Sequence, residues 1–289
     1  MTKDKFKRKT FLKGLLMGLC DLVPGISAGT IAFITGIYER LITAIKGFSP
    51  SLAYNLITFN KQELSQDIKR LDLKFLATLV SGILIAIIFF SKIILFLLES
   101  YFSFTMIFFV GLILASAKTI FDHIERHHSM NTAVSLVGLA LGVSLAFLIP
   151  ANVQPTVWYV FLGGFLAISA MVLPGISGSF ILLILGVYSF MLESLHDLPN
   201  RINYVLAFIV GAILGLVVIS RIVSLLFKKD KSKTLYFLLG LVIGGLSVPI
   251  REIYHTINLG TVSVIVHIVI FFLGILAAYW IKKLAKRGE

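Results

Sequence analysis

The chain has 289 residues, of which 58% are hydrophobic and 14% charged, with a mean hydropathy of +0.98. Soluble domains carry about 25% charged residues, so this composition excludes an ordinary soluble protein and predicts an integral membrane protein. The formal net charge of +12 falls in loops and tails beside apolar segments, which is typical of cytoplasmic loops rather than of a nucleic-acid-binding protein. The single cysteine, Cys20, excludes an internal disulfide.

Residues 10–45 form an apolar segment that we expect to break at its centre. Residues 21–30 read Asp-Leu-Val-Pro-Gly-Ile-Ser-Ala-Gly-Thr. Proline removes a backbone donor and fixes φ, and glycine leaves helical geometry at little cost. In lipid, a broken helix persists only where its backbone is buried in protein or lines a wet cavity. The break is therefore a candidate binding site.

The rest of the chain predicts one more broken segment and six full spans. A polar stretch, residues 46–74, follows the first broken segment, and the second one covers about 156–192, where residues 172–180 read Val-Leu-Pro-Gly-Ile-Ser-Gly-Ser-Phe. Runs near 20 apolar residues are long enough to cross the membrane. The predicted spans are 75–98, 104–121, 131–149, 204–227, 234–250 and 261–281.

An internal repeat relates the two broken segments and continues beyond them. Gly36 and Tyr38 match Gly186 and Tyr188. At a second constant offset, Gly82, Ser91, Lys92 and Gly111 match Gly211, Ser220, Arg221 and Gly240. Such self-similarity decides the fold class. We expect an all-α polytopic membrane protein of two repeats, 1–152 and 153–289, each with a Pro-Gly-broken re-entrant helical hairpin plus three transmembrane helices.

The distribution of basic residues predicts the topology. If each broken segment enters and leaves on one side, both termini and most Lys and Arg residues fall in the cytoplasm, and only Arg201 and Arg251 face outside. Three crossings per repeat then invert the second repeat relative to the first. Inverted repeats with discontinuous helices are the architecture of many secondary transporters. We expect the two Pro-Gly breaks to meet inside the membrane.

The residues around the two breaks predict an anion site. Each break should open a half-helix whose first amides lack intrahelical partners, and free N–H groups, hydroxyls and the helix dipole together favour an anion. The alternative is that the small residues only allow close helix packing. The predicted ligands at the breaks are Pro24, Gly25, Ser27, Gly29, Thr30, Pro174, Gly175, Ser177, Gly178 and Ser179.

Five charged residues in or beside apolar segments are further candidates. Lys92 and Arg221, at equivalent positions of the two repeats, and Arg40 would add positive charge to the site, although long basic side chains also snorkel to the interface. Asp21 and Glu39 are candidates for binding a coupling ion, a proton or sodium. The alternatives are an N-cap role for Asp21 and a simple pair at the membrane rim for Glu39.

These motifs closely resemble those of the bacterial polyprenyl-phosphate transporter family. The resemblance rests on residues 21–30 with the Gly-Ile-Tyr-Glu-Arg-Leu run at 36–41, and on residues 173–180 with Gly186 and Tyr188. It departs from the family at Ala28, where a second glycine is usual, and at Ser189, where an acidic residue often follows the tyrosine. The resemblance implies that undecaprenyl phosphate is translocated from the outer to the cytoplasmic leaflet of the bacterial cell membrane for recycling in cell-wall synthesis.

We therefore expect an alternating-access flippase that binds the lipid phosphate between the two breaks. It should need no cofactor, metal or catalytic residue, since the sequence carries no metal-ligand spacing, Ser/His/Asp arrangement or phosphate loop. The alternatives are a secondary transporter of a small soluble anion and a membrane-bound lipid phosphatase. The oligomeric state stays open.

Overall fold

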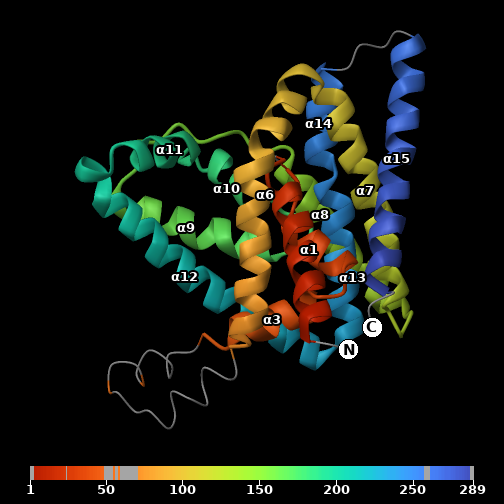
Figure 1. Cartoon of the computed structure of the whole chain (residues 1–289), viewed down its shortest axis with the longest axis horizontal. Helices are drawn as coiled ribbons and strands as arrows, with labels where there is room; N and C mark the ends of the chain where they lie inside the picture. Colours follow the sequence, from red (N-terminus) through yellow and green to blue (C-terminus); the bar gives the residue numbers. More distant parts are fainter. Residues whose placement is uncertain are drawn as a thin grey trace.

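The computed structural model describes residues 3–23, 25–48, 55, 58, 71–256 and 261–286, and the elements within them are all helices (Figure 1). This confirms the all-α fold class. The helices of the first half are α1 (Lys3–Asp21), α2 (Ala28–Ile34), α3 (Tyr38–Lys46), α6 (Leu73–Ser100), α7 (Phe102–Asp122) and α8 (Ser129–Leu145). Those of the second half are α9 (Val157–Val172), α10 (Gly178–Ile184), α11 (Tyr188–His196), α12 (Leu198–Lys229), α13 (Lys231–Gly245), α14 (Ser247–Thr256) and α15 (Thr261–Lys286).

Five helical stretches in the described chain are long and apolar enough to cross a membrane. They are α6, α7, α12, α15 and the stretch formed by α13 and α14 together. Two further pairs, α2 with α3 and α10 with α11, are apolar enough when joined but bend by 119° and 107°. The protein is therefore a multi-pass membrane protein with two sharply bent helix pairs, one in each predicted broken segment.

Two helices differ from their predicted spans. The span predicted at 131–149 is helical only to Leu145, and Pro150 disfavours helix at Ile149, the last residue of the predicted span. The chain then extends, and the Ala151 amide donates to the Ile184 carbonyl at 2.8 Å. The span predicted at 234–250 breaks near Leu246 and continues as α14 to Thr256. The Gly244-Gly245 pair and Pro249 flank this break.

Glycines at positive φ turn the chain at both predicted breaks. Gly25 has a φ of 79° and Gly175 a φ of 90°, a region that side chains with a Cβ rarely adopt. Gly36 and Gly186, at 71° and 69°, make the second turn of each hairpin, between α2 and α3 and between α10 and α11. The matching glycines of the two repeats therefore serve matching turns.

Four closely packed helix pairs hold the molecule together. α1 packs on α6 and α9 on α12, each within one half, whereas α7 packs on α15 and α8 on α13, each across the two halves. Glycines permit this approach: a Cβ added at Gly82 would lie 2.3 Å from the Phe11 carbonyl oxygen, and one at Gly240 only 1.9 Å from that of Ser135. Close packing at small residues is how helices associate in lipid, where no hydrophobic force joins them.

α3 and α11, the short helices that follow the second turn of each hairpin, lie at opposite ends of the molecule. In Figure 1, α3 lies at the lower end, together with the start of α1 and the end of α15, and α11 lies at the upper end. α3 packs against α12 of the other half, with Tyr38 6.1 Å from Phe227 between ring centroids. α11 packs on α12 of its own half, and no comparable packing joins it to α6 in the described chain.

Candidate functional site at the two helix breaks

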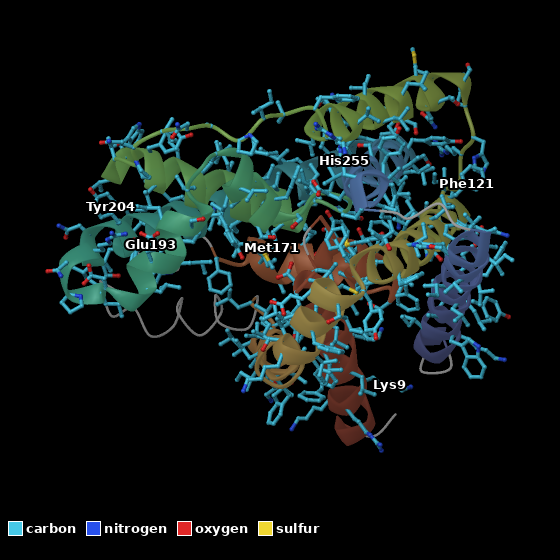
Figure 2. The ribbon with its side chains drawn as sticks, turned by 90° about the horizontal axis from the view of Figure 1, so that it is seen from above. Lys9, Phe121, Met171, Glu193, Tyr204 and His255 are labelled. Atoms are coloured by element: carbon cyan, nitrogen blue, oxygen red, sulfur yellow. The ribbon has the colours of Figure 1, made fainter. Side chains whose placement is uncertain are left out.

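The two breaks meet, as the sequence predicts, and they bond to each other. We call residues 22–30 the first tip and residues 173–179 the second tip; Pro24 lies outside the described residues. The Ser27 hydroxyl donates to the Leu173 carbonyl at 3.1 Å, and the Gly175 amide donates to the Thr30 hydroxyl, also at 3.1 Å. Figure 2 shows Met171, just before the second tip, where the two halves join.

The polar groups at the tips are almost entirely buried. Ser27, Thr30 and Ser177 have exposed fractions of 1%, 0% and 3%. The Ser177 and Ser179 hydroxyls lie 2.9 Å apart. Buried hydroxyls in a membrane are costly unless bonded, and here each of these hydroxyls has a partner. The tips therefore form a closed polar junction in an apolar interior.

The two tips differ in how their helices begin. Ser27 caps α2, since its hydroxyl accepts a hydrogen bond from the Gly29 amide at 3.2 Å. Ser177 stands at the same place before α10 but makes no such bond. Asp21 is the last residue of α1. The alternative in which Asp21 caps the following half-helix is therefore wrong, because Ser27 fills that position.

The tips are packed against the break between α13 and α14. A Cβ added at Gly175 would lie 2.6 Å from the Val242 Cα, so the second tip touches α13 backbone to backbone. A Cβ at Gly25 would meet the side chain of Val248 at 3.4 Å, an ordinary contact distance. A Cβ at Gly29 would lie 3.0 Å from the Val172 carbonyl oxygen, and Gly178 is buried against α9. Pro174 is also buried.

Three of the predicted charged residues lie away from the tips. Arg40 forms an ion pair with Asp72 at 2.5 Å and lies over the Phe75 ring. Glu39 pairs with Lys231 of the second half at 2.7 Å. Lys92 is exposed on the surface of α6. Arg40 and Glu39 thus stabilise contacts at the lower end of the molecule, and the position of Lys92 fits a snorkelling side chain.

Arg221 and Asp21 have different surroundings. Arg221 is partly buried on α12, beside the fully buried Ser220. Asp21 is partly buried at the end of α1, next to the first tip, and no hydrogen bond or ion pair joins its carboxylate to another described residue. Of the predicted charges, Asp21 is the one adjoining a tip in the chain.

A pair of polar contacts escaped the sequence reasoning. The Lys13 ammonium donates to the Thr35 carbonyl at 2.6 Å, and the Tyr159 hydroxyl donates to the Leu185 carbonyl at 3.0 Å. Thr35 and Leu185 end α2 and α10 at equivalent places in the repeat, so each hairpin satisfies a terminal carbonyl with a side chain from its own first helix. The repeat offset points to the two carbonyls, but their partners differ in residue type.

The described residues offer no cluster of metal ligands. Among them, no group of three or more His, Cys, Asp or Glu side chains is placed to hold a metal ion. The polar groups that the fold brings together at the tips are hydroxyls and backbone groups, and their O–H and N–H donors can bind an anion.

Bent helices that meet inside a bundle of apolar spans define a polytopic membrane protein of the discontinuous-helix class. A family model described as VCA0040-like, undecaprenyl phosphate translocase-like, matches residues 17–263. The chain belongs to this family.

Two curated relatives are both described as polyprenyl-phosphate transporters. The chain is 39% identical over 237 residues to a polyprenyl-phosphate transporter of Vibrio cholerae, covering 82% of this chain and 75% of the relative. It is 27% identical over 296 residues to a polyprenyl-phosphate transporter of Staphylococcus aureus, covering 94% and 96%. No solved structure matches the chain.

Proposed function

We propose that the protein transports polyprenyl phosphate, specifically undecaprenyl phosphate, from the outer to the cytoplasmic leaflet of the bacterial cell membrane. Both relatives named above are polyprenyl-phosphate transporters, and the matching family is described by the same substrate. The observation that carries the proposal is the buried polar junction between the two tips. A phosphate cannot cross hydrocarbon unaided, because a buried charge must be paired.

The phosphate would be bound by the groups that now bond the tips together. Ser27, Thr30, Ser177 and Ser179 supply hydroxyls, and Gly175 supplies an amide that at present donates to Thr30. When the tips separate, the hydrogen bonds between them break, and the freed donors can bind the phosphate. The described contacts favour hydroxyls and amides as the phosphate ligands over Arg40, which is paired with Asp72, and over Lys92, which is exposed.

Alternating access between two inverted halves is the mechanism we propose. It is supported by a difference between equivalent elements. Every residue of α2 is buried, whereas in α10 only Gly178 is, and Tyr38 is 2% exposed where its equivalent Tyr188 is 37% exposed. α3 packs on α12, but α11 has no comparable contact with α6. In this state the lower end is closed, and exchanging the roles of the halves gives the opposite state.

Transport is tested with purified protein in liposomes that carry undecaprenyl phosphate in one leaflet. We expect the protein to speed the appearance of the head group in the other leaflet, with no release of inorganic phosphate. Equal rates in protein-free liposomes would overturn the proposal. Release of inorganic phosphate would favour a lipid phosphatase, and uptake of a small soluble anion without lipid flipping would favour an ordinary anion transporter.

A cross-link at the lower end tests alternating access. The Lys46 ammonium lies 3.2 Å from the Ser224 hydroxyl, joining α3 to α12. In a Cys20→Ala background, Lys46→Cys with Ser224→Cys should be joined by a bifunctional thiol reagent, and flipping should stop. Each single-cysteine variant, treated alike, should still transport lipid. Undiminished flipping in the cross-linked protein would show that α3 and α12 need not separate.

A further inference from the structure

A groove of about 240 Å³ lies between α14, the segment after α8, and α10. Its polar wall is formed by Arg251, Glu252 and His255 of α14. Its apolar wall includes Leu148 and Ile149, which are 47% and 83% exposed. The groove therefore joins a charged surface to exposed apolar side chains, the two environments that an anionic lipid needs.

The groove borders both tips. Val248 lines it and is also the residue that a Cβ at Gly25 of the first tip would meet. Phe180 lines it as well and directly follows Ser179. α14 runs from the level of the tips to the upper end of the molecule, and His255 lies in its last turns (Figures 1 and 2). A head group bound here would stand next to the junction on its upper side.

A polar stripe follows α14 along this course. Ser247, Arg251 and His255 are spaced by four residues, so they share one face of the helix. The Ser247 hydroxyl is buried and has no hydrogen-bond partner in the described part of the chain. Glu252 lies about 100° further round the helix, on the edge of the groove. The stripe thus begins with the unpaired Ser247 hydroxyl at the inner end of α14 and continues outward with the basic side chains of Arg251 and His255.

Arg251 is exceptional among the basic residues of the upper end. Arg201, also at that end, pairs with Glu193 at 3.2 Å and with Asp197 at 3.8 Å. No described carboxylate pairs with Arg251, whose guanidinium donates to the Ala146 carbonyl. A guanidinium has five N–H donors, and it binds phosphate oxygens two at a time. A charged side chain in a span without a carboxylate partner is a binding-site candidate by default.

We propose that this groove captures the phosphate head group of a polyprenyl phosphate before the head group reaches the tips. Arg251 and His255 bind the phosphate, and the first part of the prenyl chain lies on Leu148 and Ile149. A groove of about 240 Å³ has room for a phosphate head group and for only the start of a prenyl chain. The inference rests on the proposed function, because it takes the transported lipid as the ligand.

Binding of undecaprenyl phosphate to purified protein, measured by native mass spectrometry, tests the groove. Arg251→Ala should weaken this binding roughly tenfold or more, since charge-assisted hydrogen bonds are lost. His255→Gln should weaken the binding less than Arg251→Ala does. Glu252→Gln removes a neighbouring negative charge without changing the size of the side chain, and this variant should bind the lipid as tightly as the wild type or more tightly. Binding of undecaprenol, which has no phosphate, should be the same in all four proteins, which also shows that each variant is folded.

The outcomes separate this proposal from the transport function. If the wild type flips the lipid and Arg251→Ala and His255→Gln bind it as the wild type does, the groove is overturned while the transport function stands. Equally tight binding of phosphatidylglycerol or of inorganic phosphate, equally weakened by Arg251→Ala, would also overturn it, because the ligand would then be any anionic lipid or free phosphate. A wild type that neither binds nor flips the lipid would overturn both.

Discussion

Replacing Gly175 with alanine is expected to abolish lipid flipping and to destabilise the protein by about 3 kcal/mol. Two costs combine at this position. A residue with a Cβ loses roughly 1–2 kcal/mol in left-handed backbone geometry, and Gly175 has a φ of 90°. The added Cβ would also lie 2.6 Å from the Val242 Cα, so α13 would have to move.

Gly25→Ala is the matched control for this substitution. Gly25 has a similar φ of 79°, but the nearest atom to an added Cβ is a side-chain carbon of Val248 at 3.4 Å. We expect only the backbone cost of about 1–2 kcal/mol and partial transport. Thermal unfolding and flipping are measured for both variants. Equal losses in the two would show that the contact between the second tip and α13 has no special role.

Asp21→Asn is expected to abolish stimulation of flipping by an ion gradient while flipping without a gradient continues. Asp21 adjoins the first tip, and its carboxylate has no partner among the described residues. A partly buried carboxylate at membrane depth is a candidate for binding a proton or cation, and an amide of the same shape can bind neither in the same way. Loss of coupling should lower the gradient-driven rate roughly tenfold.

The controls for Asp21 are a conservative change and a distant carboxylate. Asp21→Glu keeps an ionisable group and should keep part of the stimulation. Glu39→Gln removes a carboxylate that is paired with Lys231 at the lower end of the molecule, and it should leave the stimulation intact. Flipping is followed in liposomes with an imposed proton or sodium gradient, one at a time. Full stimulation in Asp21→Asn would exclude Asp21 as the coupling site.

Local chemistry made part of this structure predictable from sequence. The Pro-Gly motifs predict the two breaks, where Gly25 and Gly175 have positive φ, and the repeat offset predicts that equivalent glycines serve equivalent packing. Close helix packing was the alternative to an anion site, and at Gly29 and Gly178 the structure does bring backbones together. The packing interpretation and the anion-site interpretation therefore involve the same residues. Their small side chains let the tips approach each other, and this approach brings the polar groups together.

Contacts between distant residues could not be predicted in the same way. The ion pair of Arg40 with Asp72 spans a polar stretch whose course the sequence does not specify. The choice of Ser27 over Asp21 as the cap of α2 depends on where the helix begins, and helix ends move by a residue or two with tertiary packing. The contact of α3 with α12 distinguishes the two otherwise equivalent halves, and a repeat in sequence carries no such difference.

The exchange of helices between the halves bears on how the protein is made. α7 packs on α15, which begins about 160 residues after α7 begins, and α8 packs on α13, which begins about 100 residues after α8 begins. Until then, Gly111 of α7 and Gly138 of α8 lack the backbone that they contact in the folded protein. A chain stopped near residue 152 would lack the helices on which α7 and α8 pack. These two helices therefore complete their packing only when the second half of the chain is present.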